Sequence, residues 1–137
     1  MEFKGQIASK WHAYVMMDVG LLGITALHYK GTIIQMLILA FTIMMALYLI
    51  PVYFRNKVVV DKKNIVIYFG FLKRTIPTKE VVALKEQSYG RSAFNAGTRG
   101  VGIVSKTIET TYVSVKDLAE FIKEIQRLNH SVKHFIL

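Results

Sequence analysis

The sequence predicts an α+β protein, in which an N-terminal two-helix transmembrane hairpin precedes an antiparallel β-barrel or sandwich capped by a C-terminal amphipathic helix. Three observations predict it. Residues 32–54 hold no charged side chain over 23 positions. Residues 57–113 hold short β-branched and aromatic runs separated by turn residues. Residues 118–128 repeat apolar side chains at helical spacing. We therefore assign residues 1–56 to the hairpin and residues 57–137 to the β domain.

The second hairpin helix, expected at about residues 32–54, has the stronger features of a membrane span. An α-helix rises about 1.5 Å per residue, so roughly 20 apolar residues cross a hydrocarbon core of roughly 30 Å. Pro51 lies near its end, where the missing backbone donor favours termination of the helix. The alternative is a buried helix of a soluble protein. The length of the run and the basic residues that follow it argue against this alternative.

The first hairpin helix, expected at about residues 11–28, is a weaker span. Asp18 interrupts its apolar run, at a cost of about 2.5 to 3.5 kcal/mol near mid-span unless the carboxylate protonates, pairs or faces another helix. Gly20 and Gly23, with Ala26, are expected to form the small face on which the two helices of the hairpin approach each other closely. The alternative is a cleaved signal peptide, but no clear small-residue cleavage pattern follows.

Basic residues lie on both outer sides of the hairpin, and only Lys30 lies between its two helices. The flanking residues are Lys4, Lys10, Arg55, Lys57, Lys62 and Lys63. Because basic residues concentrate on the cytoplasmic side of membrane proteins, we expect a multi-pass protein of the cell membrane. Both termini and the β domain are then cytoplasmic.

The charge of the chain lies almost entirely beyond the hairpin. The net charge is +9, and residues 55–137 contain 15 Lys and Arg against 7 Asp and Glu, which gives +8. Nucleic acid is one target of such charge. A domain held at the cytoplasmic leaflet already faces anionic lipid, at about 1 kcal/mol per well-placed Lys or Arg. We therefore expect anionic headgroups, and no nucleic acid, as its partner. The chain has no Cys, which excludes disulfides and thiolate sites.

Six strands are expected in the β domain, at residues 57–60, 64–69, 73–76, 81–87, 101–105 and 107–113. No βαβ alternation occurs, so the sheet is expected to be antiparallel. The closing helix is expected at about residues 115–130, with Ser114 as its N-cap and Asp117 in its first turn. The tail, residues 131–137, either docks on the domain or contacts lipid.

The order of these parts resembles that of bacterial pleckstrin-homology-like (PH-like) domains. The residues that carry the resemblance are VVVDKKNIVIYFGFLKRTIPTKEVVALKEQ, then RGVGIV, then YVSVKDLAEFIKEIQRLN. Ile65, Ile67 and Gly70 match the opening motif of that family, followed by Ile76-Pro77, and Ser114 to Phe121 match the start of its closing helix. Many such domains follow two membrane spans. The resemblance implies a PH-like β domain.

A narrower resemblance is to the self-immunity proteins of leaderless bacteriocins of the aureocin and lacticin Q type. Those proteins are small, strongly basic and have two spans with one PH-like domain. Lys outnumbers Arg 13 to 5, as expected of an AT-rich Gram-positive genome. The resemblance implies protection of a producer cell from its own cationic, pore-forming peptide. The alternative is a membrane-associated binding or scaffold protein of the same fold with an unrelated lipid or protein partner.

No pattern in the sequence indicates an enzyme, a metal site or a cofactor. The four His residues lack H-E-x-x-H spacing, although His130 and His134 are close enough to meet on a helix face. The candidate site is instead a set of basic loop residues that we expect to gather on one rim: Lys62, Lys63, Lys73, Arg74, Arg91 and Arg99. Such a rim holds phosphate headgroups. The alternative is a solvated basic face. The sequence leaves the oligomeric state open.

Overall fold

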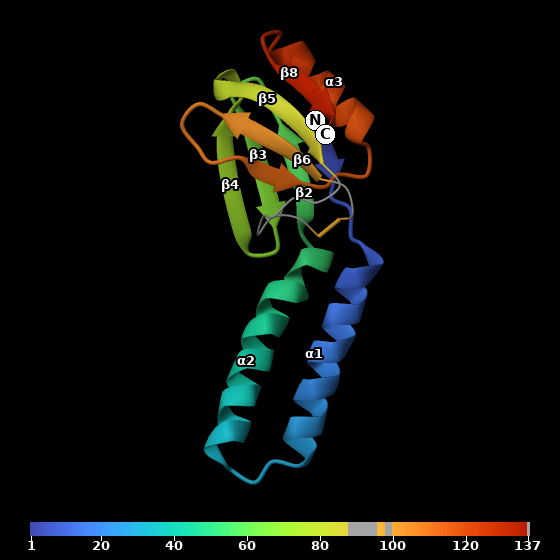
Figure 1. Cartoon of the computed structure of the whole chain (residues 1–137), viewed down its shortest axis with the longest axis vertical. Coiled ribbons are helices and arrows are strands. Elements are labelled where there is room, and N and C mark those ends of the chain that lie inside the picture. Colours follow the sequence, from blue (N-terminus) through green and yellow to red (C-terminus); the bar gives the residue numbers. More distant parts are fainter. Residues whose placement is uncertain (88–95, 98–99, 137) are drawn as a thin grey trace.

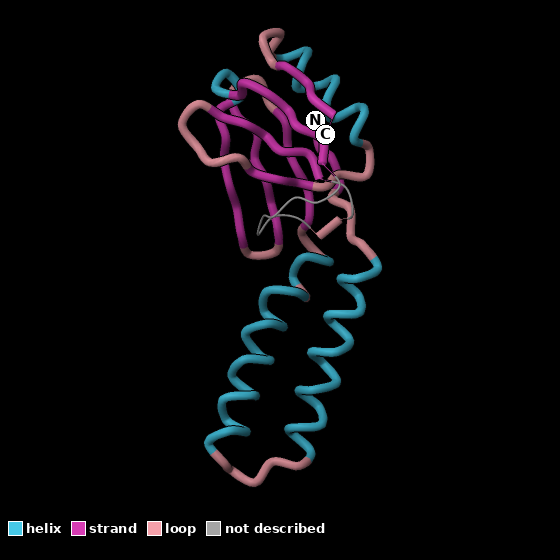
Figure 2. Tube along the Cα trace, viewed as in Figure 1, coloured by secondary structure: helices cyan, strands magenta, loops and turns pink. Residues whose placement is uncertain are grey.

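The computed structural model describes residues 1–87, 96–97 and 100–136. Two N-terminal helices form a long hairpin that projects from a β domain with two sheets and a C-terminal helix (Figure 1). Figure 2 shows the strands gathered in one body, with the hairpin extending from one end. The α+β class and the order of helical hairpin, sheets and closing helix are therefore confirmed.

The hairpin consists of α1 (Ser9–Leu27) and α2 (Ile33–Leu49), and a short 3-10 helix, η1 (Pro51–Tyr53), follows α2. As predicted, α2 ends just before Pro51, which begins η1. The segment Ile33–Tyr53 has 21 residues and is strongly apolar, and only 11% of an 18-residue stretch of it is buried. Among the described residues it is the one helix with the length and composition of a membrane span. The helix α1 does not reach that standard.

The polar residue Gln35 closes the hairpin loop. Its side chain accepts a hydrogen bond from the backbone N–H of Lys30 at 2.7 Å and donates one to the carbonyl of His28 at 3.0 Å. The hydroxyl of Thr32 accepts from the backbone N–H of Gln35 at 3.3 Å, which caps α2. A polar residue at this end of the apolar run therefore satisfies backbone groups that the turn leaves unpaired.

The first sheet has the order β1-β2-β3-β4 and is antiparallel throughout. Its strands are β1 (Glu2–Lys4), β2 (Asn56–Val60), β3 (Asn64–Phe69) and β4 (Leu72–Pro77). The sequence grouped β1 with the hairpin, but β1 pairs with β2 and buries Phe3. Because β1 has three residues and precedes α1, local periodicity carries no signal for it.

The second sheet has the order β7-β6-β5-β8. Its strands are β5 (Val81–Gln87), β6 (Gly100–Ser105), β7 (Thr111–Val113) and β8 (Lys133–Ile136), and a 3-10 helix, η2 (Thr78–Glu80), connects β4 to β5. The tail therefore docks on the domain as β8. It pairs with β5 in parallel, which corrects the expectation of a wholly antiparallel sheet. The parallel direction arises because α3 carries the chain back before β8 begins.

The two sheets meet along one seam and do not close into a barrel. At the seam, Gly5 bridges Val115, the N–H of Gln6 donates to the carbonyl of Ser114 at 2.9 Å, and the N–H of Lys116 donates to the carbonyl of Lys4 at 2.9 Å. In the part of the chain that the structure describes, β4 and β8 are sheet edges that do not pair with each other. Of the two expected forms, the closed barrel is therefore wrong.

The closing helix, α3, spans Leu118–Leu128, within the predicted range. Its N-cap is Asp117, whose side chain accepts from the N–H of Glu120, and not Ser114 as predicted. Ser114 is buried at the seam between the sheets. Phe121 of α3 lies edge-on to Phe3 with ring centroids 5.4 Å apart. These rings belong to a core that draws apolar side chains from both sheets and α3.

The hairpin is fixed to the β domain by Trp11. Its indole N–H donates to the carbonyl of Leu49 at 3.2 Å, so it also satisfies the end of α2. Its ring lies 5.6 Å from that of Phe69 and 5.8 Å from that of Tyr48. Together with Leu49, Val52 and Ala96, these residues form a second, smaller core at the junction. The start of α1 and the end of α2 are therefore held against the end of β3.

Candidate functional site

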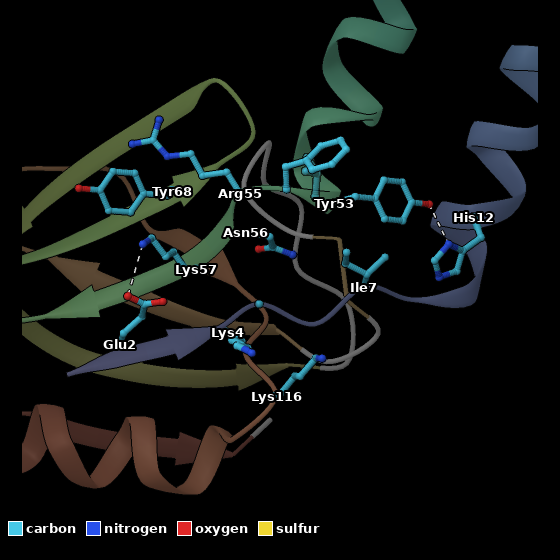
Figure 3. A pocket seen from close by; sticks show the side chains of 13 residues that line it. Glu2, Lys4, Ile7, His12, Tyr53, Arg55, Asn56, Lys57, Tyr68 and Lys116 are labelled. Atoms are coloured by element: carbon cyan, nitrogen blue, oxygen red, sulfur yellow. Dashed lines mark hydrogen bonds and ion pairs between the residues drawn. The ribbon is translucent and has the colours of Figure 1, made fainter.

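A groove of about 850 Å³ lies where the hairpin joins the β domain. We call it the junction groove. Figure 3 shows its labelled side chains converging from β1, the start of α1, η1, β2, β3 and the segment before α3. Its polar and charged lining residues are Glu2, Lys4, His12, Tyr53, Arg55, Asn56, Lys57, Tyr68 and Lys116.

A cross-strand row of side chains forms one wall of the groove. In the register of the first sheet, Lys4 is paired with Lys57, Lys57 with Tyr68, and Tyr68 with Lys73. Paired residues share one face of a sheet, with Cβ atoms about 4.5 to 5.5 Å apart. The buried neighbours Val58 and Ile67 face the opposite side. The row therefore lies across the outer face of all four strands, near the end of the sheet that is next to the hairpin.

The ring of Tyr68 holds three cations around it. The guanidinium carbon of Arg55 lies 4.3 Å from the ring centroid, and the ammonium nitrogens of Lys57 and Lys73 lie 5.6 and 5.7 Å from it. A cation within about 6 Å of an aromatic face is attracted by the ring quadrupole. The ring therefore holds three cationic side chains close together, although they repel one another.

The groove carries an excess of positive charge. Glu2 is the only carboxylate among its described lining residues, and it pairs with Lys57 at 3.3 Å. Both side chains of this pair are substantially exposed, so the pair is weak. Lys4, Arg55 and Lys116 also line the groove, while Lys73 adjoins it. Five cations against one carboxylate give a surplus of four, which favours a bound anion.

A buried donor also lines the groove. The side-chain nitrogen of Asn56 is inaccessible to solvent and has no hydrogen-bond partner among the described residues. An unpaired buried donor costs about 1 to 3 kcal/mol, so an acceptor that reaches it is stabilising. Gly5 packs directly on this amide, and a methyl group at Gly5 would overlap it. The close approach of Gly5, directly after β1, therefore fixes the position of the Asn56 amide.

A polar pair closes the hairpin side of the groove. The hydroxyl of Tyr53, in η1, and Nδ1 of His12, in α1, are 2.8 Å apart and share a hydrogen bond. Their rings are tilted by 30° to each other, with centroids 5.3 Å apart. This contact links the two helices at the level where the basic side chains begin.

The structure separates the basic residues that the sequence grouped on one rim. Lys62 and Lys63 lie in the β2–β3 turn, at the end of the sheet farthest from the hairpin (Figure 1). Lys73 belongs to the cross-strand row. Arg74 faces the interior side of β4, and its guanidinium donates to the hydroxyl of Thr111 at 2.8 Å, so it links the two sheets. Arg91 and Arg99 lie outside the described residues.

A second, smaller pocket of about 430 Å³ lies beside Lys62 and Lys63. Asp61, Glu124 and Arg127 also line it, so its charges are mixed. This distal surface therefore offers less surplus charge to an anion than the junction groove.

Part of the junction groove was readable from the sequence. A turn centred on residues 61–63 sets Lys57 opposite Tyr68, and a two-residue turn at 70–71 sets Tyr68 opposite Lys73. Lys4 and Lys116 could not be found in this way, because only the tertiary pairing of β1 brings them there.

The residues that the structure describes contain no cluster of His, Asp and Glu able to hold a metal ion. His130 and His134 do not share a helix face, because α3 ends before them and His134 lies in β8, 3.0 Å from a carboxylate oxygen of Glu86. Comparisons with protein-family models, curated proteins and solved structures find no match.

Proposed function

We propose that the protein is a membrane-anchored binding protein whose hairpin crosses the bilayer and whose junction groove holds anionic lipid headgroups. The observation that carries the proposal is the position of the cations. Arg55 and Lys57 follow the apolar segment Ile33–Tyr53 directly, and Lys4 is paired with Lys57. If that segment spans the hydrocarbon, the cross-strand row stands at the depth of lipid phosphates.

The exposed apolar surface of α2 supports the membrane assignment. Only 11% of an 18-residue apolar stretch in this segment is buried. The exposed side chains include Ile34, Leu37, Phe41, Met44 and Leu47. An uncovered apolar surface of this length needs lipid or another chain to cover it. A buried helix of a soluble protein would have that cover within its own fold.

The helix α1 serves as the second span in this proposal. Asp18 lies on the side of α1 that also carries Trp11 and Thr25, which are the buried residues of that helix. One carboxylate oxygen of Asp18 is inaccessible to solvent and has no hydrogen-bond partner among the described residues. Facing a partner helix offsets part of the cost of a carboxylate in the membrane. Both ends of the hairpin then lie on one side of the bilayer, which the flanking basic residues make cytoplasmic.

A PH-like β domain is the fold assignment that we attach to this function. Two facing sheets joined to a closing helix support it. The strand β1 before the hairpin and the parallel β8 are additions to the pattern that the sequence resembles.

Native mass spectrometry of the full chain in detergent tests the proposal. It measures the binding of added phosphatidylglycerol and phosphatidylcholine. The triple variant K4Q/K57Q/K73Q should lose the preference for the anionic lipid, and added salt should weaken binding to the unaltered chain. The control variant K62Q/K63Q/K123Q removes the same charge from exposed positions away from the groove and should keep the preference. A preference kept by the first variant and lost by the control would favour the distal turn instead.

Bacteriocin immunity is a second candidate function. Gly20 and Gly23 do not lie between the two helices as expected from the sequence, because a methyl group added at either would meet no atom within 4 Å. The observation that favours immunity is this open face of α1. Small residues let a second helix approach closely within a bilayer, so this face could receive a helical peptide. The basic junction groove would repel a cationic peptide, so direct protection would have to act through the hairpin.

This second candidate is tested in a sensitive Gram-positive host. The full chain should raise the inhibitory concentration of a leaderless cationic bacteriocin several-fold, and the variant G20L/G23L should protect less at equal membrane abundance. The control I34L alters an exposed side chain of α2 and should protect fully. Unchanged susceptibility to a panel of such peptides, with the protein in the membrane, would remove immunity and leave headgroup binding standing.

A further inference from the structure

We infer that the β3–β4 turn is a second membrane contact, in which Phe71 enters the interfacial region of the bilayer and holds the β domain against the lipid surface. The inference rests on the proposed insertion of the hairpin. It goes beyond headgroup binding, because it assigns an apolar contact to a part of the β domain outside the groove.

The turn is short and its tip is exposed. Phe69 and Leu72 are the last paired residues of β3 and β4, which leaves a two-residue loop of Gly70 and Phe71. Gly70 has φ +60°, which suits the first position of such a loop and is a conformation that side chains other than glycine rarely adopt. Because the tip lies beyond the last cross-strand pair, no strand covers Phe71, and its side chain is 75% exposed.

The depth of the tip is fixed by contacts with the end of the apolar segment. The N–H of Gly70 donates to the carbonyl of Arg55 at 2.6 Å. A methyl group at Gly70 would lie 3.3 Å from the side chain of Pro51 and 3.4 Å from that of Val52. Figure 1 shows this turn at the end of the β domain nearest the hairpin. When α2 spans a bilayer, Phe71 therefore stands where the hydrocarbon ends.

A second exposed ring and the nearby charges fit a lipid surface as the occupant. Phe54, directly after η1, is 86% exposed and belongs to the same end of the molecule. Lys73 and Arg55 flank the turn and gather around Tyr68. Apolar rings bordered by cations match an interface whose inner part is apolar and whose outer part carries anionic headgroups. A single exposed aromatic ring is common on a protein surface. Phe54 and Phe71 instead lie together at the level where the span ends.

The experiment uses the absence of Cys from the chain, so that one introduced Cys carries one label. The full-length variants F71C, F54C, K62C and I43C are labelled with an environment-sensitive fluorophore and reconstituted in vesicles of phosphatidylglycerol and phosphatidylcholine. Lipids with a nitroxide near the headgroup or deep in the acyl chain, and aqueous iodide, act as quenchers. Ile43 lies midway along Ile33–Tyr53 and is exposed, so its label reports insertion of the hairpin.

The labels at positions 71 and 54 should be quenched by the shallow nitroxide and be several-fold less accessible to iodide than the label at position 62. The label at position 43 should be quenched by the deep nitroxide. If position 43 is deep while positions 71 and 54 match position 62 in iodide, the membrane contact of the turn is refuted and hairpin insertion stands. If position 43 is itself accessible to iodide, both insertion and the turn contact are refuted. Both Phe residues are exposed, so neither substitution removes packing. Position 54 reports the end of the apolar segment, so accessibility of position 71 alone to iodide also refutes the membrane contact of the turn.

Discussion

In the β domain, sixteen buried apolar side chains from both sheets and α3 form one core, whereas the buried residues of α1 and α2 are only Trp11, Thr25, Thr42 and Leu49. These counts refer to the described residues. The β domain thus encloses its own apolar surface, as a water-exposed fold does. The hairpin leaves most of its apolar surface uncovered. Substitutions in the two regions should therefore differ, because a buried side chain of the β domain loses packing when it is truncated and an exposed side chain of the hairpin does not.

The largest contrast is expected between two phenylalanines. Phe121 is fully buried, so Phe121→Ala should lower the free energy of unfolding of the β domain by about 3 to 5 kcal/mol. Phe41 is 61% exposed on α2, so Phe41→Ala in detergent should change stability by no more than about 0.5 kcal/mol. Denaturation of the full chain, monitored by the circular dichroism signal of its strands, measures the change in the free energy of unfolding for both variants. Equal losses would mean that the hairpin has packing that the structure does not show.

Two glycines should respond with opposite signs. A methyl group at Gly5 overlaps the side chain of Asn56, so Gly5→Ala should destabilise the junction by about 1 to 3 kcal/mol. Gly20→Ala meets no neighbour and should stabilise α1 by about 0.5 to 1 kcal/mol through helix propensity. The melting temperatures of the two variants in the same detergent test this. Destabilisation by Gly20→Ala would indicate that another helix already occupies that face.

Trp11 couples the two regions, so its replacement should have an intermediate effect. Trp11→Phe keeps an aromatic ring but removes the donor to the carbonyl of Leu49, at a cost of about 1 kcal/mol. Thermal unfolding should then show the hairpin and the β domain separating into less cooperative transitions. Circular dichroism is the suitable probe, because Trp11 is the only tryptophan of the chain. A single unaltered transition would contradict the coupling.

The smallest expected effect lies on the surface of α3. Arg127 donates hydrogen bonds to Glu124 at 2.7 and 3.0 Å, and these bonds are the main cause that lowers the pKa of Glu124 below its ordinary value of 4.5. Because the pKa is lowered on folding, the pair stabilises the protein above pH 4.5, and this contribution is lost as the pH falls through the folded pKa. In Arg127→Gln, an NMR titration should show the pKa of Glu124 rising towards 4.5, with little change in overall stability.

The candidate site was predictable only where turns fix the register of neighbouring strands. Lys73 was named from the sequence and lies in the cross-strand row. Lys62 and Lys63 were named with it and lie at the other end of the sheet, because β2 and β3 run between the two turns. Arg74 was named as a headgroup contact, but alternation along β4 turns it towards Thr111. Nearness in sequence therefore did not decide which face or which end a basic residue occupies.

Local patterns in the sequence predict the two helices of the hairpin, the strands β2 to β6, the amphipathic helix α3 and the end of α2 before Pro51. These features follow from periodicity, turn residues and the missing donor of proline, which act within a few residues. Three features follow from tertiary contacts alone: β1 pairs with β2, β8 runs parallel to β5, and the two sheets do not close into a barrel. The pairing of β1 with β2 sets Lys4 beside Lys57, and a backbone hydrogen bond to Lys4 brings Lys116 to the same groove. These pairings join segments more than 45 residues apart in the sequence. They depend on burial and backbone hydrogen bonding across the whole domain, so no pattern within a few residues predicts them.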